Sequence, residues 1–111
     1  MKQIAHPKPL SADEILADAT NIIASYIPDA RIFLFGSRAK GDARETSDFD
    51  IAVDAGSKIS LGVIARIRGE IDELRTLKSI DIIDLNRANP AFKTIIRKSG
   101  VNIYDRSKIT A

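Results

Sequence analysis

Hydrophobic positions recur along this chain with two different spacings. In some segments they return every three or four residues, which is typical of a helix with one buried face. In others they run almost consecutively over a few residues, which is typical of strands. The first predicted helix begins after Ser11 and ends before Pro28. Two further helices are predicted over residues 60–77 and 90–98. The predicted strands cover residues 31–35, 48–53, 79–85 and 101–104.

Capping signals support the helix boundaries. Ser11, with Glu14 three residues later, matches a capping box, in which each side chain bonds the backbone N–H of the other residue. Pro90 suits the first turn of the last predicted helix, because the missing N–H of proline costs nothing there. Within that helix we expect Ile95 and Ile96 to face the core.

The order of these elements indicates the fold class. A helix precedes two strands, a second helix precedes the third strand, and a last helix precedes a short edge strand. This order predicts an α/β domain of the α+β type, with a small mixed sheet and helices packed on it. The strand at 79–85 is almost continuously apolar, so we expect it to be covered on both faces. We expect one domain over residues 11–104, an extended lead-in over 1–10 and a flexible tail over 105–111.

Composition narrows the possible functions. The chain has 111 residues, about the size of one domain, and contains no Cys, which excludes disulfides and zinc–thiolate sites. A formal net charge of +2 and 5% aromatic residues do not indicate direct nucleic-acid binding, which usually needs a clustered basic face. No apolar run approaches the roughly 20 residues of a membrane-spanning helix, and the N-terminal residues lack the apolar core of a signal peptide. We therefore expect a cytoplasmic protein.

The candidate chemistry lies between the first two predicted strands. The first strand breaks at Gly36-Ser37, and a polar loop leads to Asp48 and Asp50 at the start of the second. Side chains two residues apart on a strand share a face, so these two carboxylates should stand side by side. Two neighbouring anions repel one another, and a cation between them would relieve the repulsion. The backbone N–H groups of a glycine-serine turn can also bind an anion.

Two common phosphate and metal motifs do not fit this stretch. Gly36 and Gly41 have the spacing of a P-loop, but Asp42 stands where that motif needs its Lys. A calcium-binding EF-hand loop counted from Asp48 would need Glu at its twelfth position, where this chain has Ile59. Both motifs are therefore excluded.

A phosphate-binding turn beside a carboxylate pair suits phosphoryl or nucleotidyl transfer. Mg²⁺ in proteins is usually bound by one or two carboxylates together with substrate phosphates, and such ions assist this chemistry. A structural explanation is equally open at this point. Asp48 would then cap the strand, and Asp50 would pair with Arg38 or Arg44.

A third carboxylate would strengthen the functional interpretation. Asp81 and Asp84 lie on the third predicted strand, three residues apart, so they point to opposite faces and only one can join the pair. The spacing leaves both possibilities open. Asp54 would share the face of the pair, but at the far end of its strand, and is not included.

The stretch resembles a known family. Gly36-Ser37, ten further residues and then Asp48-Phe49-Asp50 match the signature of the DNA polymerase β-like nucleotidyltransferases. The longer sequence Leu-Phe-Gly-Ser-Arg-Ala-Lys-Gly-Asp, followed by Ser-Asp-Phe-Asp-Ile-Ala-Val, is similar to the minimal nucleotidyltransferase (MNT) group of that superfamily. The resemblance implies the polymerase β-like nucleotidyltransferase fold, and it favours Asp81 over Asp84 as the third carboxylate.

The resemblance also implies roles for individual residues. Three carboxylates would be catalytic and would bind two Mg²⁺ ions, with ATP as the donor: Asp48, Asp50 and Asp81. Three residues of the turn would bind the nucleotide phosphates: Gly36, Ser37 and Arg38.

A protein partner is implied as well. Minimal nucleotidyltransferases are commonly the antitoxin of a two-gene system whose toxin is a HEPN-domain ribonuclease. The resemblance therefore implies an enzyme that transfers AMP from ATP to a hydroxyl, with a tyrosine of a partner HEPN toxin as the acceptor. Two alternatives stay open. One is a non-catalytic, nucleotide-binding antitoxin that neutralises its partner by complex formation, and the other is transfer to a small molecule such as an aminoglycoside.

Overall fold

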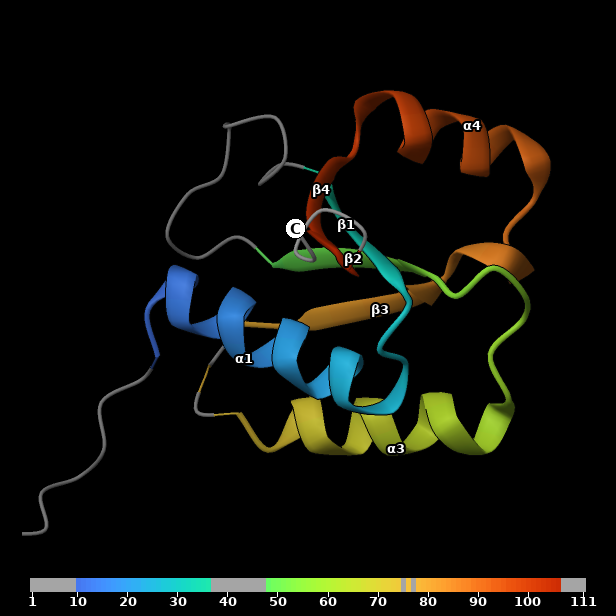
Figure 1. Ribbon diagram of the computed structural model, residues 1–111. Coiled ribbons are helices and arrows are strands. Elements are labelled where there is room, and N and C mark those ends of the chain that lie inside the picture. The colour runs from blue at the N-terminus through green and yellow to red at the C-terminus, as the bar shows by residue number, and fades with distance from the viewer. Residues whose placement is uncertain (1–9, 37–47, 75, 77, 107–111) are drawn as a thin grey trace, which may run out of the picture.

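Helices and strands follow one another in the predicted order. The computed structural model describes residues 10–36, 48–74, 76 and 78–106. Its helices are α1 (Ala12–Tyr26), α3 (Leu61–Asp72) and α4 (Pro90–Ser99), with a short 3-10 helix, η1 (Leu85–Arg87). Its strands are β1 (Arg31–Phe35), β2 (Phe49–Asp54), β3 (Ile80–Asp84) and β4 (Val101–Asp105). The predicted α/β class with a small mixed sheet is confirmed (Figure 1).

The strands form one mixed sheet in the order β3-β2-β1-β4. β1 runs antiparallel to both of its neighbours, whereas β2 and β3 run parallel. A parallel pair needs a long crossover connection, and α3 forms it. In this arrangement β3 and β4 are the edge strands. The starts of β2 and β3 meet at one end of the sheet, beside the end of β1.

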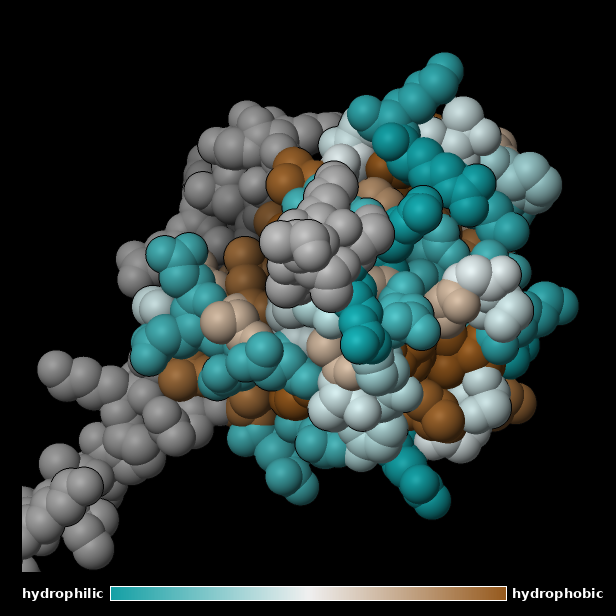
Figure 2. All heavy atoms as spheres, in the orientation of Figure 1, coloured by the Kyte–Doolittle hydropathy of each residue, from teal (hydrophilic) through white to brown (hydrophobic). Residues whose placement is uncertain are grey.

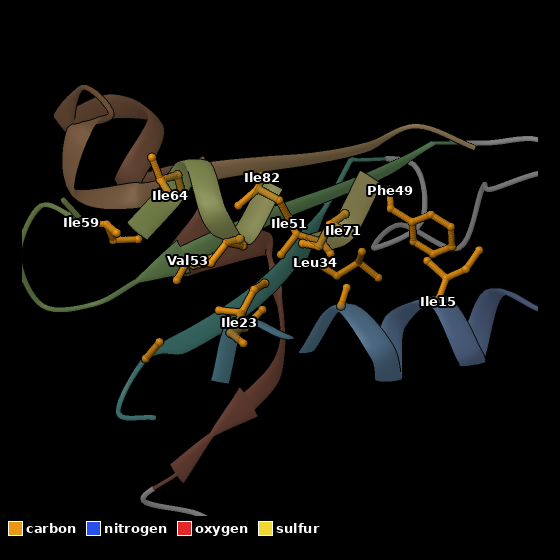
Figure 3. Close-up of a cluster of buried hydrophobic side chains, with 14 residues drawn as sticks. Ile15, Ile23, Leu34, Phe49, Ile51, Val53, Ile59, Ile64, Ile71 and Ile82 are labelled. Carbon is orange, nitrogen blue, oxygen red and sulfur yellow. The ribbon is translucent and has the colours of Figure 1, made fainter. Parts of the chain in front are cut away.

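Helices cover both faces of the sheet (Figure 1). α1 and α3 pack on one face over the larger hydrophobic core, where Figure 3 shows Ile15 of α1 beside Phe49 of β2. α4 packs on the other face over a smaller cluster, whose buried members are Ala52, Leu85 and Ile96. The sheet is therefore the middle layer of three, and its two faces have different environments.

Capping interactions fix the starts of two helices. The backbone N–H of Ser11 donates to Glu14 Oε1 at 2.9 Å, and the N–H of Glu14 donates to Ser11 Oγ at 3.2 Å. At α4, Asn89 Oδ1 accepts a hydrogen bond from the N–H of Phe92 at 2.8 Å, and Pro90 occupies the first turn. These bonds satisfy N–H groups that have no partner inside the helix. The capping box and the Pro90 start are thus confirmed.

α3 is shorter than its predicted range of 60–77. It ends at Asp72, and the N–H of Leu74 then donates to the carbonyl of Ile71 at 3.0 Å. The N–H of Thr76 donates in turn to the carbonyl of Leu74 at 2.8 Å. These short-range bonds tighten the chain into a turn, because it must reverse direction to enter β3.

Two predictions about which residues are buried were wrong. Ile96 is 1% exposed, but Ile95 is 57% exposed, because consecutive helix residues point about 100° apart and only one of them can face the sheet. β3 was expected to be covered on both faces, but it is an edge strand and its Asp81 is exposed.

The predicted lead-in and tail fall mostly outside the described residues, which exclude 1–9 and 107–111. β4 continues to Asp105, one residue past the predicted domain end at 104. Within the described ranges, no helix is both long enough and apolar enough to cross a membrane.

Candidate active site

β2 divides its side chains between the two faces of the sheet. Phe49, Ile51 and Val53 are 0% exposed and belong to the core beneath α1 and α3. Asp50 alternates with them and therefore lies on the opposite face, which it shares with Ala52. Ala52 packs beneath α4, whereas Asp50, nearer the start of the strand, is only partly buried. This face of β2 is therefore apolar at Ala52 and polar at Asp50, toward the start of the strand.

The register of the sheet places a second carboxylate beside Asp50. Asp50 pairs with Asp81 in the parallel β2–β3 ladder and with Phe35 in the antiparallel β1–β2 ladder. Neighbouring strands lie about 4.8 Å apart, and directly paired residues point to the same face. Phe35, Asp50 and Asp81 therefore form a row across three strands. The structure brings the two carboxylates together although they are far apart in the sequence.

Asp48 directly precedes β2 and is held by the chain that leads into β3. Its Oδ1 accepts a hydrogen bond from the backbone N–H of Ser79 at 3.2 Å. The N–H of Phe49 donates to the carbonyl of Ser79 at 2.9 Å. These two bonds join the entrances of β2 and β3. Sequence reasoning missed Ser79, because its contribution comes from backbone groups that almost any residue would carry.

Gly36 forms the turn at the end of β1, next to Asp50. Its φ of +74° lies in the left-handed region that favours glycine. A Cβ at this position would lie 2.4 Å from Asp50 Oδ2, closer than two non-bonded atoms can approach. The turn therefore requires glycine for two reasons, its backbone conformation and the space that the carboxylate occupies.

Asp50 is the point at which the negative charges of the site interact. Burial raises the pKa of Asp50 above its ordinary value, and the carboxylates of Asp81 and Asp48 raise it further. Like charges disfavour ionisation of one another, and a bound cation would have the opposite effect. The folded chain therefore holds these groups together at an electrostatic cost, which is common at functional sites.

The donor set fits a hard cation such as Mg²⁺, which prefers carboxylate oxygens. Among the described residues, no Lys or Arg forms an ion pair with Asp48, Asp50 or Asp81. The three side chains do not form a closed group, however. In the part of the chain that is described, no three His, Cys, Asp or Glu side chains are arranged to hold one metal ion. The structure thus shows neighbouring carboxylates and not a completed coordination sphere.

Asp84, the other carboxylate of β3, has a structural environment. It is 6% exposed, accepts a hydrogen bond from the N–H of Ile59 at 2.8 Å, and lies 3.2 Å from Nε of Arg87. Arg87 also donates to the carbonyl of Ile59 at 2.8 Å. These contacts tie the loop before α3 to η1. Asp81, three residues earlier, is exposed and is the β3 carboxylate that joins the site face.

Asp54, at the far end of β2, is also bound by its neighbours. Its Oδ1 accepts hydrogen bonds from the N–H of Gly56 and from Nδ2 of Asn86, both at 2.9 Å, and its Oδ2 lies 3.5 Å from Nη2 of Arg97. Burial alone would raise the pKa of Asp54. The hydrogen bonds from Asn86 and Gly56, together with the charge of Arg97, outweigh burial and lower the pKa.

Of the six predicted site residues, two lie outside the described ranges: Ser37 and Arg38. Their roles stay predictions. The remaining four are Gly36, Asp48, Asp50 and Asp81, and all four lie at the same end of the sheet.

Comparison with known proteins gives a consistent family. The family model described as "Polymerase beta, Nucleotidyltransferase" matches residues 13–109. The probable protein adenylyltransferase MntA of Haemophilus influenzae is 30% identical over 95 residues, which cover 86% of this chain and 83% of that protein.

Solved structures share the fold. A crystal structure of a toxin-antitoxin with AMP-PNP has 21% sequence identity and a TM-score of 0.62, and the similarity covers 84% of this chain and 75% of that one. A tri-AMPylated Shewanella oneidensis HEPN toxin in complex with MNT antitoxin gives 20% identity and a TM-score of 0.53, over 86% of this chain and 76% of that one. Since the family match spans nearly the whole sequence and the structures share its architecture, the chain belongs to the polymerase β-like nucleotidyltransferase family.

Proposed function

We propose that this protein is a Mg²⁺-dependent adenylyltransferase that transfers AMP from ATP to a tyrosine hydroxyl of a HEPN-domain toxin, and so acts as its antitoxin. The observation that carries the proposal is the pairing of Asp50 with Asp81, beside a Gly36 turn that has no room for a side chain. A relative named as a protein adenylyltransferase and a fold neighbour bound to an AMPylated HEPN toxin support the choice of AMP and of a protein acceptor.

The carboxylates have different roles in the proposed reaction. Asp48 and Asp50 would hold two Mg²⁺ ions, with Asp81 completing one site. Bound Mg²⁺ neutralises phosphate charge and lowers the pKa of an attacking hydroxyl. The transfer forms a bond from the tyrosine oxygen to the α-phosphorus and breaks the bond from that phosphorus to the oxygen bridging to the β-phosphate, which releases pyrophosphate. Asp81 would accept the hydroxyl proton on a carboxylate oxygen, and its exposed position on an edge strand is one that a second protein can reach.

The glycine turn would bind the nucleotide. Gly36 has no side chain to cover its backbone, so a phosphate can approach closely. Ser37 and Arg38 would contact the β- and γ-phosphates, since a hydroxyl donates one hydrogen bond and a guanidinium can donate two in parallel. We assign this activity to residues 11–104 and to the cytoplasm, where ATP and a co-expressed toxin are both available.

Mass measurement of a co-expressed partner tests the proposal. A HEPN-domain toxin co-expressed with this chain is expected to carry added AMP units, and labelled AMP should appear on it when purified proteins receive α-labelled ATP and Mg²⁺. The double variant Asp48→Ala/Asp50→Ala should leave the partner unmodified. Asp72→Ala, which removes an exposed carboxylate at the end of α3, is the control and should preserve modification.

Two results would favour the alternative functions. A partner that is fully neutralised but never modified would overturn the enzymatic proposal and favour inhibition by complex formation alone. Turnover of ATP with an aminoglycoside, in the absence of any protein partner, would overturn the choice of a protein acceptor.

A further inference from the structure

Two phenylalanine rings meet beside the candidate active site. Phe35 is the last residue of β1 and pairs directly with Asp50, so the Cβ atoms of the two residues lie about 5 Å apart on the same face of the sheet. Phe92 belongs to the start of α4, which packs on this face. The ring centroids of Phe35 and Phe92 are 5.6 Å apart, and the ring planes meet at 85°. This is the edge-to-face arrangement that aromatic pairs prefer.

Both phenylalanines are partly exposed, although each packs against the smaller hydrophobic cluster beneath α4. Phe92 has a fixed position, because its N–H donates to the Asn89 cap at 2.8 Å. Figure 2 shows mostly hydrophilic side chains on the outer surface of α4, at the top of the view. Two perpendicular rings leave at least one face of each ring free of the other. The pair therefore offers an apolar corner between α4 and the sheet that fits a flat aromatic ligand.

Three directions lead away from Asp50 on its face of the sheet. One leads to the Gly36 turn, where the proposed function places the phosphates. A second leads to Asp81 on the edge strand, where the acceptor hydroxyl approaches. The third leads toward α4 and the two phenylalanine rings. Only the ribose joins the base of a nucleotide to its α-phosphate, so the base must lie near Asp50, and the third direction is the one that the phosphates and the acceptor leave open.

We infer that the Phe35–Phe92 pair binds the base of the donor nucleotide, which stacks on a phenylalanine ring. This inference rests on the proposed function and deepens it, because it names the residues that hold the base. Every base has a π-face, and its stacking on an aromatic side chain contributes substantially to binding. The carboxylates and the glycine turn would then hold the phosphates, while the aromatic pair supplies affinity for the nucleoside.

Binding of two probes in the presence of Mg²⁺ tests the inference. One is a non-hydrolysable ATP analogue, and the other is tripolyphosphate, which has the phosphates but no base. Phe92→Leu keeps an apolar side chain and removes the ring. It should raise the dissociation constant of the ATP analogue about tenfold, which is within the range for loss of a base-stacking ring, and leave the binding of tripolyphosphate unchanged. Titration calorimetry measures both, and thermal unfolding checks the fold.

Phe33→Leu is the matched control. Phe33 packs against the same cluster, but it pairs with Ala52 and lies about 7 Å from Phe35 along β1, away from Asp50. The same substitution there should leave the dissociation constants of both probes unchanged.

A second variant gives a spectroscopic readout. The chain contains no Trp, so Phe92→Trp introduces a single indole at the pair. Stacking on the base should quench its fluorescence when the ATP analogue is added, whereas tripolyphosphate should not. Ile95→Trp is the control on the same helix, because Ile95 is 57% exposed, and its fluorescence should stay constant with both probes.

Three results would overturn the inference. The first is that Phe92→Leu binds the ATP analogue as tightly as the parent protein. The second is an equal loss of affinity for both probes, which would mean that the substitution disturbs the phosphate site. The third is unchanged fluorescence of Phe92→Trp at saturation with the ATP analogue.

Failure of the proposed reaction has a different result. A parent protein that binds the ATP analogue through Phe92 but never modifies the toxin would overturn the transfer reaction and support the base site. A parent protein that binds neither probe would overturn both.

Discussion

At the scale of single residues, the two ends of β2 carry carboxylates in opposite electrostatic states. Asp50 has a raised pKa because burial and two neighbouring carboxylates disfavour its charge, whereas Asp54 has a lowered pKa because hydrogen bonds and Arg97 favour its charge. A carboxylate whose charge is stabilised by hydrogen bonds and an arginine contributes to folding stability. Carboxylates that repel one another favour the binding of a cation. The contrast separates a structural carboxylate, Asp54, from a candidate functional one, Asp50, on the same strand.

Gly36 allows a test at this scale. Gly36→Ala should lower the free energy of unfolding by about 1–2 kcal/mol, because alanine disfavours a positive φ and its Cβ would displace the Asp50 carboxylate. AMP transfer should fall by at least about 100-fold, since misplacement of a reacting group by about 1 Å can have this effect. Chemical denaturation and labelled ATP measure the two results.

Gly56→Ala is the matched control for Gly36→Ala. Gly56 also has a positive φ, +82°, but a Cβ there would meet nothing within 4 Å. It should therefore lose a similar backbone contribution to stability and keep its activity. Equal activity loss in both variants would show that the close approach to Asp50 is not important.

At the scale of elements, local signals in the sequence predicted most of the fold. The capping box at Ser11, the proline start of α4 and the limits of β1 depend on neighbouring residues, and they are present as expected. The errors depend on tertiary context. The end of α3 is set by the turn into β3, and the exposure of β3 is set by its place at the edge of the sheet.

In the candidate site, too, some residues could be predicted from local sequence signals and others depend on tertiary contacts. The spacing of Asp48 and Asp50 indicated a charged cluster at the start of a strand. The third carboxylate lies on β3, which α3 separates from β2 in the sequence, so spacing alone could not identify it. The register of β2 against β3 and the buried contacts of Asp84 distinguish Asp81 from Asp84 by structure. The hydrogen bond from the Ser79 backbone to Asp48 has no sequence signal at all.

Asp54 gives a prediction about the links between elements, because its contacts join β2 to η1 through Asn86 and to α4 through Arg97. Its pKa is lowered in the folded state, so its contribution to stability is present above the unfolded pKa of about 3.9 and is lost as the pH falls through the lower folded value. Asp54→Asn should therefore reduce the free energy of unfolding at pH 7 by about 1 kcal/mol.

The pH dependence identifies the cause. Below the folded pKa of Asp54, the parent protein and Asp54→Asn should converge in stability, and urea denaturation at a series of pH values measures this. A constant difference over the whole acid range would mean that the substitution acts through packing and not through the charge of Asp54.

At the scale of the whole molecule, the sheet separates the larger hydrophobic core from the candidate active site. The core beneath α1 and α3 contains the large buried side chains, such as Phe49 and Ile51, while the carboxylates cluster on the other face at one end. Ligands that bind only the folded state stabilise it. The repulsion among the carboxylates should therefore make the stability of the whole protein sensitive to cation and nucleotide.

Thermal unfolding tests this coupling. Mg²⁺ with a non-hydrolysable ATP analogue, at about 100 times the dissociation constant, should stabilise the parent protein by about 2.7 kcal/mol. Asp50→Asn removes one of the repelling charges, so without ligand it should be slightly more stable than the parent, by about 0.5 kcal/mol after allowance for solvent screening. The variant should show little response to Mg²⁺, and removal of Mg²⁺ by a chelator should reverse the stabilisation of the parent.

An equal response of the parent and Asp50→Asn to Mg²⁺ would place cation binding elsewhere in the protein. Asp72→Ala is the control for general charge effects, because Asp72 is exposed at the end of α3. It should respond to the ligand as the parent does.

β4 lies at the edge of the sheet opposite β3, and its last residue, Asp105, pairs with Arg31 at the start of β1. The carboxylates lie beside the other end of β1, where Phe35 pairs with Asp50. The chain therefore leaves the described fold diagonally opposite the surface on which the proposed chemistry occurs. An affinity tag or fluorophore fused after Arg106 can attach the protein to a sensor chip with the β3 edge directed toward solution. Kinetic binding measurements with a captured protein then become practical without a change to the described fold.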